Sequence, residues 1–410
     1  MVNCRNCQGS NLTRFLDLGT APVSNGYLTK DQLSKSEEWI PLRVMICTDC
    51  WLAQTEDFIT GLDVFTPDYA YFSSMSQSWL DHSAKYVAET VERFQLNETS
   101  FVVEIASNDG YLLSSVQQRG IPCLGIEPTA STAAAAREKG IETLEVFLNT
   151  TTAKGIVSSH GKADLVVANN VLAHVPDIVD FSKSLAFLLK PNGVLTVEFP
   201  RITTLIDQSQ FDTVYHEHFS YLSLHSVISV FERADLEVFD VEELDTHGGS
   251  LRVFSQLRSL GKQGKSVSVD SVLAFELDRG IQTREYYSHI QSNAEKVKRK
   301  LLTVLLNAQQ RNEIVAGYGA AAKGNTLLNY SGIRQDLLNY VVDRSESKIG
   351  KYLPGSRIPI LNVDQIRESK PSTILVLPWN LYPEVQRQLA FTAEWGAELV
   401  IANEHIQLKS

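Results

Sequence analysis

The sequence has 410 residues, more than a single hydrophobic core usually serves, so we expect two or three domains. Hydrophobic residues make up 43% of it and charged residues 21%, which provides enough apolar surface for folded cores and excludes a disordered chain. The formal charge of -11 and the pI near 5.4 argue against a nucleic acid partner, because phosphate backbones are bound by clustered Lys and Arg.

The chain begins Met1-Val2-Asn3-Cys4, without the basic and then apolar stretches of a signal peptide. No apolar run approaches the roughly 20 residues that a membrane-spanning helix needs. We therefore expect a cytoplasmic protein that has no membrane partner. The polar surface of the third domain is compatible with a monomer, and the sequence leaves an oligomer open.

Two Cys-x-x-Cys pairs, Cys4/Cys7 and Cys47/Cys50, lie within residues 1–65 and have the spacing of a zinc knuckle. With four thiolate ligands the metal has no open position, so this zinc-binding module predicts structural Zn²⁺. The alternative is a pair of redox dithiols, but neither pair opens a helix after a strand. The fifth cysteine, Cys123, falls in a predicted strand and is expected to belong to the core.

Residues 66–258 alternate β-branched runs with helix-like stretches, which is typical of a doubly wound parallel sheet. The runs are 101–105, 123–126, 165–167 and 194–197, followed by two late strands at 236–239 and 251–254 that suit a terminal antiparallel pair. Residues 259–410 begin with a polar helical segment and then repeat the strand rhythm at 314–319, 340–343, 373–377 and 399–401. The sequence thus predicts an α/β chain with two Rossmann-like units behind the N-terminal module.

A candidate cofactor loop follows the first run of the middle domain, where Glu104 precedes the small residues Ala106, Ser107 and Asn108. Glu127 ends the next run, at the distance expected for a carboxylate that holds two ribose hydroxyls. Each acid could instead cap a strand or a helix. The pair alone fits S-adenosylmethionine and a nicotinamide cofactor equally.

The segment from Asp164 to Asp177 decides between the two cofactors, because it resembles the fourth-strand motif of class I methyltransferases. The resemblance places Asn169 and Asn170 next to the sulfonium and His174 in the following turn. For His174, a surface or packing role is an equally good interpretation.

Several groups suited to proton abstraction lie between Asp212 and Tyr221, after the run at 194–197. An imidazole is a base near neutral pH, a carboxylate can orient it, and a tyrosine can stabilise negative charge. His216, Glu217 and His218 are also possible metal ligands, but their spacing is not that of His-Glu-x-x-His. An ordinary amphipathic loop is the remaining alternative.

These motifs occur in an order that resembles the three-domain S-adenosylmethionine-dependent sugar C-methyltransferases, which act on nucleotide-linked keto-deoxysugars. The resemblance spans essentially the whole chain: the four-cysteine module, the Glu104 loop, Tyr215-His-Glu-His218, Thr246-His-Gly-Gly-Ser-Leu-Arg252 and the C-terminal Rossmann-like unit.

The resemblance implies that His218 removes a proton from a carbon, C3, beside the ketone of a 4-keto-sugar, with Tyr215 and Glu217 close by. The enolate then takes the methyl group in line. The cofactor residues implied are Tyr69, Tyr71, Glu104, Ala106, Asn108, Asp109, Leu112, Glu127, Pro128, Asn169, Asn170 and His174.

The nucleotide-linked sugar is expected to lie against the C-terminal domain, with its diphosphate at a helix start near Lys323. The implied substrate residues are His247, Gly248, Arg252, Tyr318, Lys323, Asn325 and Asp343. The same domain also fits a structural unit that binds nothing. Two rival functions are an O- or N-methyltransferase acting on a sugar or another small metabolite, and a non-catalytic zinc-stabilised binding module.

Overall fold

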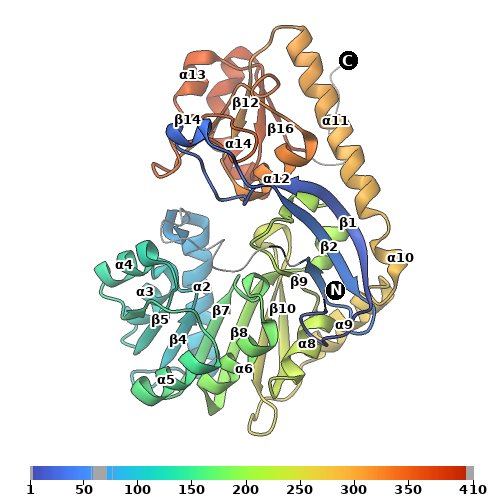
Figure 1. Cartoon of the computed structure of the whole chain (residues 1–410). Coiled ribbons are helices and arrows are strands. Elements are labelled where there is room, and N and C mark those ends of the chain that lie inside the picture. The colour runs from blue at the N-terminus through green and yellow to red at the C-terminus, as the bar shows by residue number, and fades with distance from the viewer. Residues whose placement is uncertain (1–2, 57, 59–71, 76, 403–410) are drawn as a thin grey trace.

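A computed structural model describes residues 3–56, 58, 72–75 and 77–402. Its three parts follow the chain order, with the C-terminal sheet above the middle sheet and the N-terminal strands between them (Figure 1). Tyr69 and Tyr71, two of the predicted cofactor residues, lie outside the described residues. No helix within the described ranges has both the length and the apolar character needed to cross a bilayer.

The N-terminal module is built on two long antiparallel strands, β1 (Leu12–Ala21) and β2 (Ile40–Cys47). Alternate residues of β2, from Ile40 to Ile46, are buried, which is the period that one covered face requires. The short strand β3 (Ala53–Thr55) pairs with β2, and β9 (Ser220–Tyr221) of the middle domain completes the sheet. The module therefore shares a sheet with a segment more than 160 residues away.

The middle domain has a seven-stranded sheet in the order β10-β11-β8-β7-β4-β5-β6. Its strands β4 to β8 are parallel, and β11 runs antiparallel to both β8 and β10, which confirms the predicted α/β unit with a terminal antiparallel pair. The strands are β4 (Val102–Ile105), β5 (Cys123–Ile126), β6 (Thr143–Leu144), β7 (Ala163–Asn169), β8 (Leu189–Pro200), β10 (Leu236–Leu244) and β11 (Ser250–Leu257).

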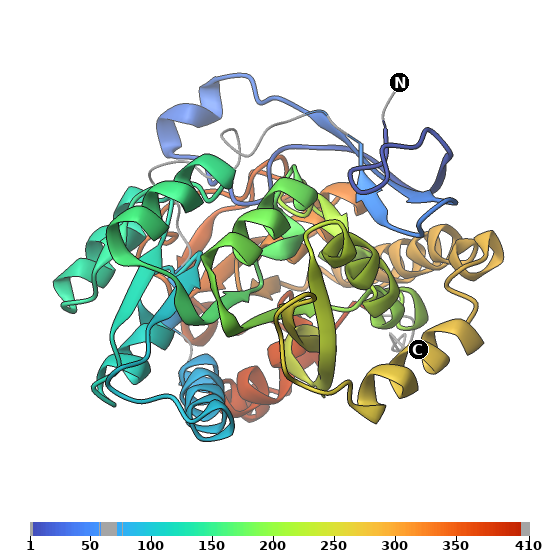
Figure 2. The same ribbon diagram turned by 90° about the horizontal axis from the view of Figure 1, so that it is seen from below.

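Helices cover both faces of this sheet (Figure 2). They are α2 (Gln77–Phe94), α3 (Tyr111–Gln117), α4 (Ala130–Glu138), α5 (Thr150–His160), α6 (Ile178–Leu188), α7 (Ile202–Asp207) and α8 (Leu224–Glu232). Because ligands bind at the carboxyl ends of strands in such sheets, the loops after β4, β5, β7 and β8 define the edge that faces the C-terminal domain.

The helical segment after β11 consists of α9 (Val267–Asp278), α10 (Arg284–Tyr287) and the 21-residue α11 (Ile290–Gln310). α11 runs along the side of the molecule to the C-terminal domain (Figure 1). Leu301 and Leu305 of this helix belong to the same apolar cluster as Leu16, Leu42 and Val44 of the N-terminal module. The module therefore packs against both larger domains.

The C-terminal domain has an all-parallel sheet in the order β14-β13-β12-β15-β16, the second Rossmann-like unit expected from the sequence. Its strands are β12 (Val315–Tyr318), β13 (Tyr340–Asp343), β14 (Ile360–Asn362), β15 (Thr373–Val376) and β16 (Glu398–Val400). Its helices are α12 (Ala322–Ser331), α13 (Gln365–Ser369) and α14 (Tyr382–Gln388). The order reverses at β12, so the β12–α12 loop is the expected ligand-binding point.

Candidate active site

A cavity of about 1190 Å³ lies between the carboxyl edge of the middle sheet and the β12–α12 loop. All three parts of the chain contribute to its lining, and Asn25 comes from the N-terminal module. The predicted residues that line it are Ala106, Asn108, Glu127, Pro128, Asn169, Asn170, His174, Tyr215, Glu217, His218, His247, Tyr318, Lys323 and Asp343.

Glu127 connects the loop after β4 to the start of α4. One of its carboxylate oxygens, Oε2, accepts a hydrogen bond from the Asn108 amide at 2.9 Å. The other, Oε1, accepts from the amide and the hydroxyl of Thr129. These bonds fix a buried carboxylate at the wall of the cavity, where ribose hydroxyls could be bound through its remaining lone pairs.

The loops at this edge hold non-glycine residues in left-handed conformations, with φ of 54° at Ala106, 50° at Asn108 and 54° at Asn170. Such conformations cost about 1 kcal/mol or more and persist where the surrounding structure enforces them, often at ligand sites. Nucleotide-binding loops of this kind usually carry glycines, which adopt such conformations easily. Here Ala106 and Asn108 adopt the same left-handed backbone without being glycine.

Glu104, in β4, is 1% exposed and does not reach the cavity lining. Burial, with smaller contributions from Glu127 and Asp109, raises the pKa of its carboxyl well above the ordinary value. Its Oε2 has no hydrogen-bond partner among the described residues. A cationic group bound at this edge would stabilise the ionised form.

Asn169 ends β7, Asn170 follows it, and both line the cavity. Asn169 Oδ1 and both side-chain polar atoms of Asn170 are buried, and no partner for them is found in the described part of the chain. Buried polar atoms are normally hydrogen-bonded, so these asparagines suit a ligand that supplies donors and acceptors.

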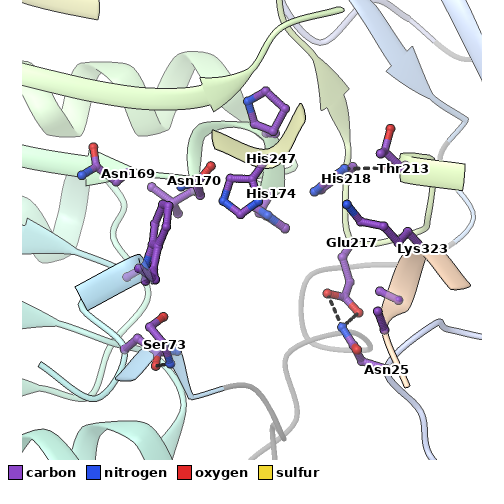
Figure 3. Close-up of a pocket in the computed structure, with 18 of the residues that line it drawn as sticks. Asn25, Ser73, Asn169, Asn170, His174, Thr213, Glu217, His218, His247 and Lys323 are labelled. Atoms are coloured by element: carbon purple, nitrogen blue, oxygen red, sulfur yellow. Dashed lines mark hydrogen bonds between the residues drawn. The ribbon is translucent and has the colours of Figure 1, made fainter. Parts of the chain in front are cut away.

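His218 lies on the opposite side of the cavity from Asn170 (Figure 3). Its Nδ1 is 3.1 Å from the carbonyl oxygen of Thr213, which can only accept a hydrogen bond. Nδ1 therefore carries the hydrogen in the neutral ring, and Nε2 is the nitrogen with the basic lone pair. The Tyr215 ring is tilted against the imidazole at a centroid distance of 4.1 Å.

Three histidines, His174, His218 and His247, line the cavity. Burial, with the neighbouring His174, lowers the pKa of His218 well below its ordinary value. Burial also lowers the pKa of both His174 and His247 to about 4. The His174 and His218 rings approach edge to face at 4.6 Å. At neutral pH all three rings are therefore in the neutral form.

Lys323, at the start of α12, brings a cation to the C-terminal wall of the cavity. Its Nζ donates to Asn380 Oδ1 at 2.8 Å and lies 4.4 Å from the ring centroid of Trp379. Burial lowers the pKa of this amine to about 8, against the attraction of Asp212. The indole of Trp379 in turn donates to Asp212 at 2.7 Å.

Asp343 and Tyr318 shape the same wall. The two Asp343 oxygens accept hydrogen bonds from the amides of Ala320 and Ser345, at 2.7 and 2.8 Å, so the carboxylate holds the β12–α12 loop. The Tyr318 hydroxyl donates to Gln388. Both side chains still line the cavity.

Several predicted residues lie outside the cavity lining. Leu112 is buried in the core, and Asp109 accepts hydrogen bonds from Ser74 and Lys139. Gly248 lies under Trp379, where an added Cβ would be 2.5 Å from the ring. The amide of Asn325 donates to the Ser24 carbonyl at 2.6 Å. These four residues support the walls of the site.

Arg252 also lies outside the cavity lining, in a buried ion-pair network of the middle sheet. Its guanidinium donates to Glu198 at 2.9 Å and to Glu242 at 3.0 Å, and its Cζ lies 4.5 Å from the ring centroid of Tyr86. Glu198 also contacts His82 and Thr246, so the network links β8, β11 and α2 behind the cavity.

Replacing Arg252 with Ala should lower the free energy of unfolding by about 3–5 kcal/mol, because Glu198 would remain buried without its cation. Urea denaturation followed by circular dichroism measures this loss. Arg258→Ala is the control: its ion pair with Glu232 is exposed, so its loss should cost about 1 kcal/mol or less. Equal losses in the two variants would contradict the structural role of the network.

The lining residues that sequence reasoning missed include Asn25, Ser73, Trp79 and His82. Trp79 and His82 are three positions apart on α2, and their rings stack at 5.0 Å, so this spacing was a usable signal. The Ser73 amide donates to Asn108 Oδ1 at 2.9 Å. Asn25 is 192 residues from Glu217, its partner, and carried no local signal.

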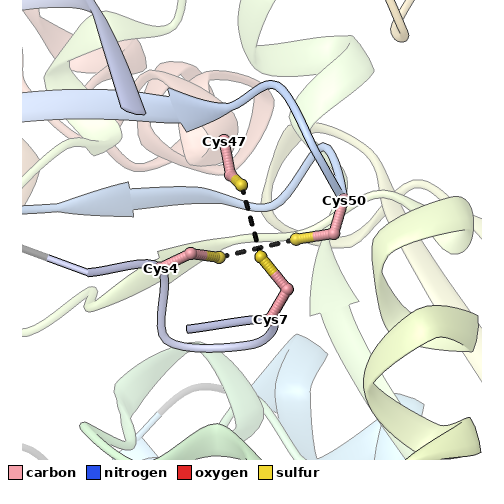
Figure 4. A group of neighbouring side chains, drawn as sticks. All are labelled: Cys4, Cys7, Cys47 and Cys50. Atoms are coloured by element: carbon pink, nitrogen blue, oxygen red, sulfur yellow. Dashed lines mark hydrogen bonds between the residues drawn. The ribbon is translucent and has the colours of Figure 1, made fainter. Parts of the chain in front are cut away.

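The four cysteines of the N-terminal module converge, with their sulfurs within 4.8 Å of one another (Figure 4). The Cys4–Cys50 and Cys7–Cys47 sulfur distances are 3.4 and 3.6 Å. A tetrahedral ion with Zn–S bonds of about 2.3 Å requires sulfurs about 3.8 Å apart, so the site fits Zn²⁺. Cys123 lies elsewhere: it is partly buried against an apolar cluster of the middle domain, and burial raises the pKa of its thiol to about 11.

Comparison with known proteins matches the chain to three domain families. Residues 4–65 match a "Putative zinc binding domain", residues 79–241 a "Methyltransferase domain" and residues 245–403 a "C-methyltransferase C-terminal domain". The C-methyltransferase NovU of Streptomyces niveus is 34% identical over 382 residues, which are 93% of this chain and 90% of that protein. The chain belongs to this C-methyltransferase family.

Other similarities of this C-methyltransferase are confined to part of the chain. The ubiquinone biosynthesis O-methyltransferase of Bradyrhizobium diazoefficiens is 28% identical over 159 residues, 33% of this chain and 62% of that protein. The crystal structure of magnesium protoporphyrin IX methyltransferase from Synechocystis PCC 6803 is 15% identical, covers 43% of this chain and 78% of that one, and has a TM-score of 0.34.

Membership of this family identifies the cofactor and the metal of this C-methyltransferase. S-adenosylmethionine is the methyl donor of the middle domain, and the four-cysteine cluster is its zinc site. The buried polar atoms of Asn169 and Asn170 line the cavity and fit a ligand that carries an ammonium and a carboxylate.

Proposed function

We propose that this C-methyltransferase methylates the carbon next to the ketone, C3, of a nucleotide-linked 4-keto-sugar, with His218 as the general base. The position of the His218 imidazole in the wall of the shared cavity carries the proposal. S-adenosylmethionine would supply the methyl group. The chain itself must bind the sugar, remove the proton and exclude water.

The proton transfer is assigned to Nε2 of His218. The hydrogen bond from Nδ1 to Thr213 fixes the tautomer, and the low pKa keeps the ring neutral and ready to accept a proton. A ketone makes the neighbouring C–H acidic, and hydrogen bonds to its oxygen in a dry site increase this acidity. Tyr215, stacked on the imidazole, and His247 both line the cavity and are candidates for that oxygen.

The cofactor is assigned to the edge of the middle sheet that Glu127 and the two asparagines form. Asn108 and Ala106 bring the backbone close to it through their left-handed conformations. The Glu127 carboxylate would hold the ribose, and Asn169 and Asn170 would face the methionine part. Because this edge and His218 share one cavity, the methyl group and the reacting carbon can meet.

The nucleotide diphosphate is assigned to the start of α12. Ala321 precedes this ten-residue helix without a side-chain cap among the described residues, so amides of the first turn remain for an anion. Lys323 adds a positive charge at the same wall, where its amine donates to the neutral side chain of Asn380. Tyr318 and Asp343 complete a surface suited to the nucleoside.

The test is the wash-in of solvent deuterium at the carbon beside the ketone. A panel of nucleoside-diphosphate-linked 4-keto-6-deoxyhexoses is incubated with the protein and S-adenosylhomocysteine in deuterated water, and mass spectrometry follows the label. We expect exchange at C3 of at least one member of the panel. An O- or N-methyltransferase would bind S-adenosylhomocysteine without exchange, and a binding module with no cofactor site would do neither.

A further inference from the structure

The N-terminal module contacts the stretch that carries His218 through its backbone. β3 pairs with β9, so that Ala53 lies opposite Tyr221, and the Thr55 amide donates to the Phe219 carbonyl at 3.1 Å. The His216 Nε2 is 3.2 Å from the Ile40 carbonyl and donates to it. The segment from His216 to Tyr221 is therefore held by the zinc-binding module as well as by its own domain.

A side chain of the module also reaches the cavity. The loop of residues 22–28 follows β1, and the Nδ2 of Asn25 donates to both carboxylate oxygens of Glu217, at 2.6 and 2.8 Å (Figure 3). Glu217 is 1% exposed, so its carboxylate needs donors to replace water. An amide provides them without adding a charge.

The C-terminal domain holds this loop from the other side. The Tyr27 hydroxyl donates to the Ala320 carbonyl at 2.6 Å, and Asn325 donates to the Ser24 carbonyl at 2.6 Å. Lys348 donates to the same Ala320 carbonyl at 2.9 Å. Because residues on both sides of Asn25 are bound in this way, its amide has a fixed position when it meets Glu217.

We propose that Asn25 is a positioning residue for the reaction: it holds the Glu217 carboxylate, and thereby the adjacent His218, in the geometry needed for proton abstraction. The zinc-binding module then contributes to the active site as well as to the fold, because it positions the Asn25 amide in the cavity. The inference rests on the proposed function, since the role of His218 as the base comes from it.

The charged groups around Asn25 and Glu217 determine the effect of a substitution at position 25. Tyr27 lies on the same loop, and His218 follows Glu217 in the chain. From the C-terminal domain, Lys323 and Lys348 bring positive charge and Asp343 negative charge to the same wall. An acid at position 25 would lie within hydrogen-bond distance of Glu217, so the two carboxylates would share a proton.

The decisive variants are Asn25→Asp and Asn25→Ala, measured by the deuterium exchange assay over a range of about pH 6 to 8. At the upper end of this pH range we expect each variant to exchange about 10- to 100-fold more slowly than the unsubstituted protein. This is the effect of losing a hydrogen bond to a charged group. In Asn25→Asp the rate relative to the unsubstituted protein should rise as the pH falls, because the protonated acid donates to Glu217 as the amide does. In Asn25→Ala that ratio should stay constant.

The control is Asn97→Asp, the same change in an exposed turn of the middle domain, which should leave exchange unchanged. Zinc content and S-adenosylhomocysteine binding of the Asn25 variants should match the unsubstituted protein. Their melting temperatures should be lower, because the buried Glu217 loses its donor, so exchange is compared at a temperature at which each variant is folded. Wild-type exchange in both variants, or equal pH-independent losses, would overturn the positioning role. If the unsubstituted protein exchanges no substrate of the panel, the proposed function itself fails.

Discussion

Replacing His218 with Gln should reduce deuterium exchange and methyl transfer by about 10²- to 10⁴-fold, the usual contribution of a general base. Glutamine has a similar size and keeps an N–H for the Thr213 carbonyl, but it has no basic nitrogen. Calorimetry should show unchanged binding of S-adenosylhomocysteine. Exchange at the wild-type rate would show that His218 is not the base.

His160→Gln is the matched control, because this histidine ends α5 and contacts Glu142, outside the cavity lining. The pH profile adds an independent measurement. Burial lowers the pKa of His218 well below 6.5, so its base form persists as the pH falls through that value. We therefore expect the exchange rate to hold at pH 6.5 and to fall only at lower pH.

A loss of exchange at low pH must be distinguished from unfolding of the protein. His174, His218 and His247 are buried in the neutral form, with lowered pKa values, so the unfolded chain binds more protons than the folded one below about pH 6.5. Stability then decreases as the pH falls from that value toward the folded pKa values. Circular dichroism at each pH identifies the range in which the protein stays folded.

Replacing Cys47 with Ser should remove the zinc and most of the soluble protein. Structural zinc contributes about 10–16 kcal/mol of apparent binding free energy in zinc-finger peptides, more than a module of this size can otherwise gain from its core. Mass spectrometry for metals and the yield of soluble protein measure the two effects.

Cys123→Ser is the control for this prediction. It makes the same atomic change in β5, away from the four-cysteine cluster, and should keep the full zinc content. Unchanged metal in the Cys47 variant would contradict the four-thiolate site.

Local patterns in the sequence were sufficient for much of the fold. The runs at 123–126 and 340–343 coincide with β5 and β13, because β-branched residues between helix-like stretches define buried parallel strands. The cysteine pairs were equally readable, since each places its two sulfurs within one turn. In contrast, the full length of β1 was missed, because its alternation is interrupted and its register against β2 is irregular near Leu16 and Thr20.

The residue roles that could not be predicted from the sequence depend on partners far away in the chain. Asn25 acquires its place at the cavity through Glu217, Ala320 and Asn325, none of which can be inferred from its neighbours in the chain. Arg252 was assigned to the substrate by the family resemblance. Its burial against Glu198 and Tyr86 follows from strand pairing, which one sequence does not reveal.

The pairing of β3 with β9 also has a consequence during synthesis on the ribosome. The N-terminal module emerges first, but the edge of its sheet next to β3 has no partner until Ser220 and Tyr221 have been translated. An unpaired strand edge invites pairing with another nascent chain. Translation of the middle domain therefore ends a period in which the new chain is exposed to aggregation.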